Sequence, residues 1–209
     1  MIRLVIFDFS GTLGDYDPAG SRRVFEKLKE FNLPVSEEKT AGRLAEVLPD
    51  CLLLARNWQE FADRIIQKLG IVLESDRREA LAAFLGKRPV HKLFGDAGEA
   101  TKLPQGKAIL TLSPKFAIAD IYELRHFEIF SPDVTGAAKP DPAAFLAVLE
   151  KMKADPEETA MVGDSLENDI LPAQSLGIKP ILLDRGGKIK NAAPPIIKIK
   201  SLKELKKYL

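Results

Sequence analysis

The chain has 209 residues, of which 45% are apolar and 29% charged, and its 31 basic and 30 acidic side chains give a formal net charge of +1. This net charge gives no indication of nucleic-acid binding. The sequence shows neither a leader pattern nor an apolar run of membrane-spanning length, so we expect a cytoplasmic protein without a nucleic-acid or membrane partner. Cys51 is the only cysteine and His91 and His126 are the only histidines, which excludes an internal disulfide, a thiolate zinc site and a histidine metal cluster.

The first predicted element is a buried strand over residues 2–7, an apolar run rich in β-branched and aromatic side chains. Asp8 follows it directly, at the carboxyl end, where parallel α/β sheets bind ligands. Gly11 allows a tight turn, while the Thr12 hydroxyl and the following amides can face an anion. An aspartate that ends a strand also commonly caps a turn, so this segment alone leaves both roles open.

Residues 16–88 are predicted to be helical throughout. Asp17 as a cap and Pro18 as a first-turn residue begin the first helix. The predicted helices cover residues 17–29, 43–56, 58–69 and 76–84. Because the block is too long for a loop, we expect a helical insert that folds over the rim of a sheet.

Strands and helices alternate in the rest of the chain. The predicted strands cover residues 107–112, 127–130, 159–162, 180–183 and 196–199. The predicted helices cover residues 114–124, 142–152, 169–176 and 202–209. This alternation predicts an α/β fold with a parallel sheet and right-handed crossovers.

Two further carboxylates follow the predicted strand 159–162. Asp164 comes just after Gly163 at the carboxyl end, and Asp169 lies in the first turn of the next helix. Carboxylates that converge at one rim repel each other unless a cation joins them, and the set Asp8, Asp164 and Asp169 suits Mg²⁺ better than zinc or copper. Helix capping by the latter two aspartates is a compatible structural interpretation.

Two other residues could face a phosphoryl group. Lys139 precedes Pro140 at the approach to the predicted helix 142–152, and a lysine held beside carboxylates could neutralise an anion. Ser113 ends the predicted strand 107–112, where its hydroxyl and nearby amides could hold an oxyanion. Ser113 could equally be a helix N-cap.

In order and spacing, these segments resemble the motifs of the haloacid dehalogenase-like (HAD) hydrolase superfamily. The matching residues are Asp8 with Gly11 and Thr12, Ser113, Lys139 with Pro140, and Gly163-Asp164 with Asp169. The resemblance implies a Rossmann-like parallel sheet core, residues 1–15 and 89–209, with a small helical cap domain over residues 16–88.

The resemblance also implies a small-molecule phosphatase. Asp8 would attack phosphorus to give a covalent aspartyl intermediate, which water hydrolyses. The implied cofactor is Mg²⁺, and its ligands would be Asp8, the Ser10 backbone carbonyl, Asp164 and Asp169. The implied phosphate-binding residues are Thr12, Ser113 and Lys139, and Lys139 would also assist catalysis.

Two residues depart from the family pattern. Ser10 stands where phosphatases of this family usually carry a second aspartate that protonates the leaving oxygen, so the general acid is weakened and good leaving groups are favoured. Pro114 follows Ser113 where many relatives in this family have Asn, a residue on which the family's dehalogenases rely. Together with the intact Gly163-Asp164 pair, this argues against halide removal.

The predicted partner is a small phosphorylated metabolite, and the sequence does not set the oligomeric state. The alternatives are a catalytically weak phosphate-binding or regulatory protein, which Ser10 motivates, and a 2-haloacid dehalogenase or phosphonatase-type hydrolase. Substrate choice would depend on side chains of the helical insert, for which the candidates are Tyr16, Arg22, Arg23, Arg43, Arg56, Asn57 and Trp58.

Overall fold

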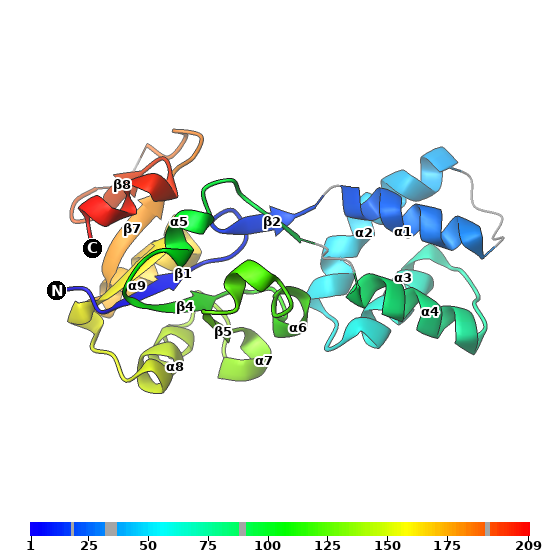
Figure 1. The fold of residues 1–209 in the computed structure, drawn as a ribbon, viewed down its shortest axis with the longest axis horizontal. Helices are drawn as coiled ribbons and strands as arrows, with labels where there is room; N and C mark the ends of the chain where they lie inside the picture. Colours follow the sequence, from blue (N-terminus) through cyan, green and yellow to red (C-terminus); the bar gives the residue numbers. More distant parts are fainter. Residues whose placement is uncertain (18, 32–36, 88–90, 191–192) are drawn as a thin grey trace. The chain divides into compact units, whose positions relative to one another are not determined.

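The structure is a computed structural model that describes residues 1–17, 19–31, 37–87, 91–190 and 193–209, with only the backbone described at 37–39 and 41 (Figure 1). The chain divides into two compact units. The sheet unit comprises Met1–Asp15, Leu93–Lys115 and Ile121–Leu209, and the helical unit comprises Tyr16–Lys92 and Phe116–Asp120. By this division the helical unit extends to Lys92 and also includes the short later segment Phe116–Asp120.

The described part of the sheet unit is built on a six-stranded sheet in the order β5-β4-β1-β6-β7-β8. All neighbouring strands in this sheet are parallel. The strands are β1 (Leu4–Phe7), β4 (Gly106–Leu110), β5 (Glu128–Phe130), β6 (Thr159–Gly163), β7 (Lys179–Leu183) and β8 (Ile197–Ile199). The predicted parallel α/β fold is thus confirmed.

The central strands form because their side chains are apolar on both faces. Every residue of β1 and of β6 is buried, as expected for strands covered by helices on both sides. In the β1–β6 register Phe7 pairs with Val162, and the Asp8 amide donates to the Val162 carbonyl at 2.9 Å. Asp8 therefore leaves the sheet beside the end of β6.

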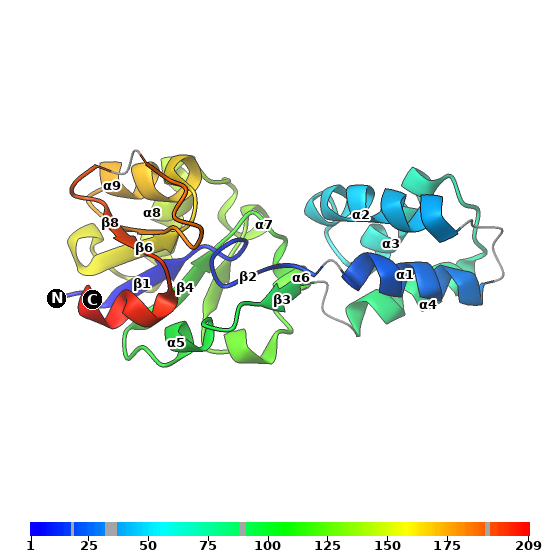
Figure 2. The same ribbon diagram turned by 90° about the horizontal axis from the view of Figure 1, so that it is seen from above.

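Helices cover both faces of this sheet. Figure 2 shows α8 (Pro142–Met152) and α9 (Leu171–Ser175) on one face, with α5 (Gly98–Thr101) and the C-terminal 3₁₀ helix Leu202–Lys207 on the other. The buried core against α8 includes Leu4, Ile6, Phe145, Val148 and Met161. The bounds of α8 match the prediction because Asp141 caps it, accepting from the Ala143 amide at 2.9 Å, and Pro142 fills its first position.

The helical unit contains four helices longer than one turn among its described residues. They are α1 (Ala19–Glu30), α2 (Glu37–Leu53), α3 (Trp58–Leu69) and α4 (Ser75–Gly86). The bounds of α3 follow from its caps, since the Asn57 side chain accepts from the Glu60 amide and Gly70 takes a left-handed conformation. The predicted first-turn residue Pro18 lies outside the described residues.

Several short elements differ from the predictions. The two-stranded sheet of β2 (Gly14–Tyr16) and β3 (His91–Leu93) was not predicted, because three residues are too few to establish a periodicity. The predicted helix 114–124 is only α6 (Lys115–Ile118) followed by a 3₁₀ turn, Tyr122–Leu124. The smaller remaining elements are the one-turn α7 (Pro132–Thr135), a 3₁₀ turn over Pro156–Glu158 and a π-helical turn over Leu166–Ile170.

Among the described residues, none of the helices combines the length and apolar character that spanning a bilayer requires.

Candidate active site

Three carboxylates from two neighbouring strand ends converge in the sheet unit. Asp8 follows β1, Asp164 follows β6, and Asp169 lies in the π-helical turn just beyond. One carboxylate oxygen from each lies within 4.8 Å of the others. The structure therefore brings together the three acidic side chains predicted from the sequence, although the first and the last, Asp8 and Asp169, are more than 150 residues apart in the chain.

Lys139 is the cation of this cluster. Its Nζ donates to Asp8 Oδ1 and to Asp169 Oδ1, both at 2.6 Å, and its side chain is only 3% exposed. Burial alone would lower the pKa of Lys139, but the charges of Asp8 and Asp169 raise it, so the amine stays protonated. The loop before α8 thus carries a fixed positive charge to the first strand end.

Two glycines allow the carboxylates to approach the backbone so closely. A Cβ on Gly163 would lie 2.4 Å from Asp169 Oδ2, and one on Gly11 would lie 2.2 Å from Asp164 Oδ2. Gly11 also has a φ of +79°, which other residues rarely adopt. Asp169 is further fixed because its Oδ2 accepts from the Ser165 amide at 3.1 Å.

The cluster is short of positive charge. Burial raises the pKa of Asp8 to about 7. The charge of Lys139 acts against this rise, and the charges of Asp169 and Asp164 add to it. Burial and the Asp169 charge also raise the pKa of Asp164. Among the described residues, one lysine stands against three carboxylates, so the arrangement is electrostatically incomplete without a further cation.

This donor set fits Mg²⁺. All three side chains offer hard carboxylate oxygens, and opposite ligands of a bound Mg²⁺ lie about 4.2 Å apart, close to the 4.8 Å spread observed. A divalent cation would also supply the missing charge. Asp8, Asp164 and Asp169 are therefore the side chains that could hold such an ion.

A cavity of about 170 Å³ opens beside the cluster. It is lined by Asp8, Ser10, Thr111, Leu112, Lys139, Asp164, Ser165, Asn168 and Asp169. Ser10 is exposed at this cavity, so the position at which the family usually carries an acid does face the acidic cluster.

The other predicted phosphate-binding residues lie differently. Because β4 ends at Leu110, Thr111 and Leu112 line the cavity, whereas Ser113 is buried and its amide donates to Thr111 Oγ1 at 3.0 Å. Thr111 was not predicted as a site residue because the predicted strand continues to residue 112, two residues beyond the end of β4. A correct strand end would have identified Thr111 as the first residue at the rim. Thr12 is fully buried, and no described residue donates to or accepts from its hydroxyl.

Four of the substrate-contact candidates of the helical unit have structural partners within that unit. Asn57 caps α3, Trp58 packs edge-on against Phe116 with ring centroids 4.9 Å apart, and Arg43 donates to the Lys68 carbonyl. Arg23 pairs with Asp17 at 2.8 Å. These contacts account for their positions without a substrate.

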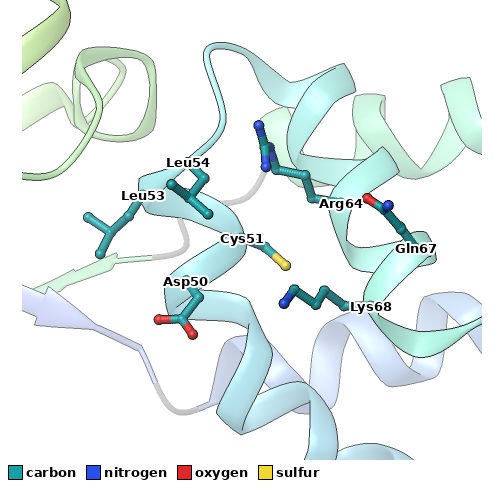
Figure 3. A pocket seen from close by; sticks show the side chains of 7 residues that line it. All are labelled: Asp50, Cys51, Leu53, Leu54, Arg64, Gln67 and Lys68. Atoms are coloured by element: carbon teal, nitrogen blue, oxygen red, sulfur yellow. The ribbon is translucent and has the colours of Figure 1, made fainter.

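The helical unit has a separate cavity of about 270 Å³ between α2 and α3 (Figure 3). It is lined by Asp50, Cys51, Leu53, Leu54, Arg64, Gln67 and Lys68. Burial raises the pKa of the Cys51 thiol, which keeps it in the protonated, unreactive form. The volume lies just below the range typical of small-molecule sites, about 300–1,000 Å³.

The fold and the acidic strand-end cluster define a class of α/β hydrolases. Residues 2–177 match the model of the haloacid dehalogenase-like hydrolase family. The chain belongs to this family, and it is a hydrolase.

Curated relatives of the chain carry phosphatase names. It is 26% identical to phosphoglycolate phosphatase 1 of Pseudomonas aeruginosa, over 97% of this chain and 78% of that one. It is 30% identical to phosphoglycolate phosphatase of Vibrio cholerae, over 94% of this chain and 92% of that one.

A solved structure with the same fold has another activity in its name. The 2-haloacid dehalogenase of Pseudomonas syringae pv. Tomato DC3000 superposes with a TM-score of 0.69 at 24% identity, covering 99% of this chain and 97% of that one. At this identity the likeness concerns the fold alone, because one fold hosts several chemistries.

Proposed function

We propose that the chain is a Mg²⁺-dependent phosphatase of small phosphorylated metabolites that works through an aspartyl-phosphate intermediate on Asp8. The observation that carries this proposal is the convergence of Asp8, Asp164 and Asp169 within 4.8 Å, with Lys139 inserted among them. The phosphatase names of the curated relatives support the same substrate chemistry.

Asp8 is the proposed nucleophile. An Asp8 carboxylate oxygen forms a bond to phosphorus while the bond from phosphorus to the leaving oxygen breaks. The leaving alcohol takes its proton from water, since Ser10 is a poor acid near neutral pH. Water then attacks the phosphorus of the aspartyl phosphate, releasing inorganic phosphate and regenerating the Asp8 carboxylate.

Charge compensation is what this chemistry requires, because a carboxylate and a phosphate dianion repel each other. Asp8, the Ser10 backbone carbonyl, Asp164 and Asp169 would hold Mg²⁺, which when bound supplies positive charge at the reacting phosphoryl group. Lys139 supplies a second positive charge from the opposite loop. Thr111, the side chain that lines the cavity in place of Ser113, is the proposed hydroxyl donor to a phosphoryl oxygen.

The helical unit is the proposed cap of the enzyme. Its place in the chain, inserted directly after the first strand and its turn, is that of the helical cap in the family pattern. In this role its side chains would select the organic part of the substrate, and the exposed Arg22 would suit a second anionic group.

Hydrolysis of two phosphate esters tests the proposal. With Mg²⁺ the purified protein is expected to release phosphate from p-nitrophenyl phosphate and, more slowly, from an alkyl phosphate. Excess chelator is expected to abolish both activities and added Mg²⁺ to restore them, because the carboxylates alone repel the substrate.

Two other results would contradict the phosphatase proposal. Metal-independent chloride release from 2-chloropropionate, without phosphate release, would identify a dehalogenase. No turnover of any phosphate ester, with binding of Mg²⁺ and inorganic phosphate retained in calorimetry, would identify a phosphate-binding or regulatory protein.

Replacing Ser10 with aspartate is expected to raise turnover of the alkyl phosphate. A general acid typically contributes about 10²–10⁴-fold, and an alkoxide needs the proton far more than a nitrophenolate does. The rate for p-nitrophenyl phosphate should therefore change much less. Steady-state kcat for the two substrates gives the comparison.

Ser10→Asn is the matched control, since it has the size of aspartate without its acidity. An equal effect of both substitutions on the alkyl phosphate would show that the missing acid does not limit the wild-type enzyme.

A further inference from the structure

A second charged group, outside the acidic cluster, contacts the turn that follows the proposed nucleophile. Arg185 lies two residues beyond β7, and its Nη2 donates to the Thr12 carbonyl at 2.8 Å. Its Nε donates to the Gly11 carbonyl at 3.4 Å. Neither Arg185 nor these contacts belong to the family motifs in the sequence.

The other edge of the guanidinium is held by Asp96. Arg185 Nη1 and Nη2 donate to the two carboxylate oxygens, each at 2.9 Å, which makes a bidentate pair. Asp96 Oδ2 also accepts from the Ser201 hydroxyl at 2.8 Å and from the Leu202 amide at 2.9 Å. The pair is therefore anchored to the start of the C-terminal 3₁₀ helix.

Asp96 stays ionised in this environment. Burial opposes its charge, but hydrogen bonds from Arg185, Ser201 and Leu202 outweigh burial and lower its pKa to about 2. The Arg185 guanidinium carbon also lies 4.4 Å from the centre of the Phe94 ring, which restricts the guanidinium plane. The side chains of Arg185 and Asp96 are 28% and 9% exposed, so removing the two charges from water offsets part of the stability that their pairing provides, and a role in geometry explains the pair more simply.

The carbonyls that Arg185 holds belong to peptide groups that are also fixed at their amide ends. The amides of Thr12, Leu13 and Gly14 donate to the Phe9 carbonyl at 3.2, 2.9 and 3.0 Å. The Gly11–Thr12 and Thr12–Leu13 peptide groups are thus hydrogen-bonded at both ends, their carbonyls to Arg185 and their amides to the Phe9 carbonyl.

These hydrogen bonds determine the direction of the Ser10 amide. The Phe9 carbonyl and the Ser10 N–H share one trans peptide group, so they point in opposite directions. Because three amides fix the Phe9 carbonyl, the Ser10 N–H is fixed as well, in a residue that lines the acidic cavity. Gly11, in the same turn, lies against the Asp164 carboxylate.

We propose that Arg185, held by Asp96, is a positioning residue that fixes the turn after Asp8, so that the Ser10 amide is placed to donate to an incoming oxyanion while Gly11 stays against the Asp164 carboxylate. The proposal concerns the turn itself, and its consequence for turnover rests on the proposed phosphatase function. Arg185 touches neither the substrate nor the reacting atoms in this role.

Three variants test the assignment: Arg185→Met, the double variant Asp96→Asn with Arg185→Met, and Arg3→Met as the control. The control removes an arginine that pairs with Glu158 at 3.2 Å, in the same unit and away from the turn. The double variant removes the unpaired buried carboxylate and so recovers the part of the lost stability that this carboxylate costs in Arg185→Met. Hydrogen exchange of amides 12–14, urea denaturation and kcat are measured for each.

The positioning role predicts that both Arg185 variants exchange amides 12–14 at least about tenfold faster than wild type, while amides of β4 and β6 stay protected in the double variant. It also predicts that kcat for p-nitrophenyl phosphate falls by about 10²-fold in both Arg185 variants. In the double variant kcat should stay low even though stability rises. Arg3→Met should match wild type in all three measurements.

Unchanged exchange at amides 12–14 in the double variant would overturn the assignment, whatever the activity. Recovery of wild-type kcat together with stability would also overturn it, since a structural role alone then suffices. An inactive wild-type protein would instead refute the phosphatase function, and the exchange measurement would still decide on the turn.

Discussion

An Asp8→Asn variant is expected to lose phosphatase activity by about 10⁴-fold or more while keeping its fold. The amide cannot form the aspartyl phosphate, so the proposed reaction has no first step. The fold should survive because the substitution removes one of three clustered like charges and leaves Lys139 paired with Asp169 at 2.6 Å. Single-turnover phosphate release and urea denaturation measure the two effects.

Asp120→Asn is the matched control, since Asp120 is an exposed aspartate of the other unit. It should leave both activity and stability unchanged. Retention of more than about a tenth of wild-type activity in Asp8→Asn would rule out Asp8 as the nucleophile.

A Lys139→Met variant is expected to lose both stability and activity. Its ammonium is buried between Asp8 and Asp169, and removing it leaves the three carboxylates without their cation. Breaking a buried pair in this way typically costs about 3–5 kcal/mol of the free energy of unfolding. Urea denaturation in chelator measures this loss, and kcat should fall by about 10²–10³-fold as positive charge at the phosphoryl group is lost.

Mg²⁺ should recover more stability in Lys139→Met than in wild type, because the variant cluster is more negative and binding to the folded state alone stabilises it. Lys198→Met is the control, since Lys198 pairs with Asp184 at 2.8 Å through a more exposed side chain. If Lys139→Met in chelator is as stable as Lys198→Met, the charge balance inferred for the cluster is wrong.

The parts of the molecule that could be predicted from the sequence are those that depend on strand ends. Parallel strands place their carboxyl ends at one rim, so Asp8 and Asp164 were expected at the same rim once both strands were recognised. That β1 and β6 are neighbours, which brings the two side chains together, is seen in the structure. The bounds of α3 and α8 were also accessible, because Asn57, Gly70 and Asp141 are local capping signals.

The remaining features depend on information that is not local. Whether Thr111 or Ser113 reaches the cavity depends on where β4 ends, and it ends two residues before the end that the apolar run suggests. The contacts of Arg185 with Asp96 and Thr12 join residues 89 and 173 positions apart, and no periodicity or capping pattern links them.

The position of β1 has a consequence for how the protein is made. β1 is translated before both of its neighbours in the sheet, which are β4, Gly106–Leu110, and β6, Thr159–Gly163. The apolar side chains of β1 therefore lack one of their two neighbouring strands until β6 has been synthesised, which exposes them to premature association. The proposed reactive centre, which needs Asp164 beside Asp8, can accordingly be assembled only after β6 has been translated.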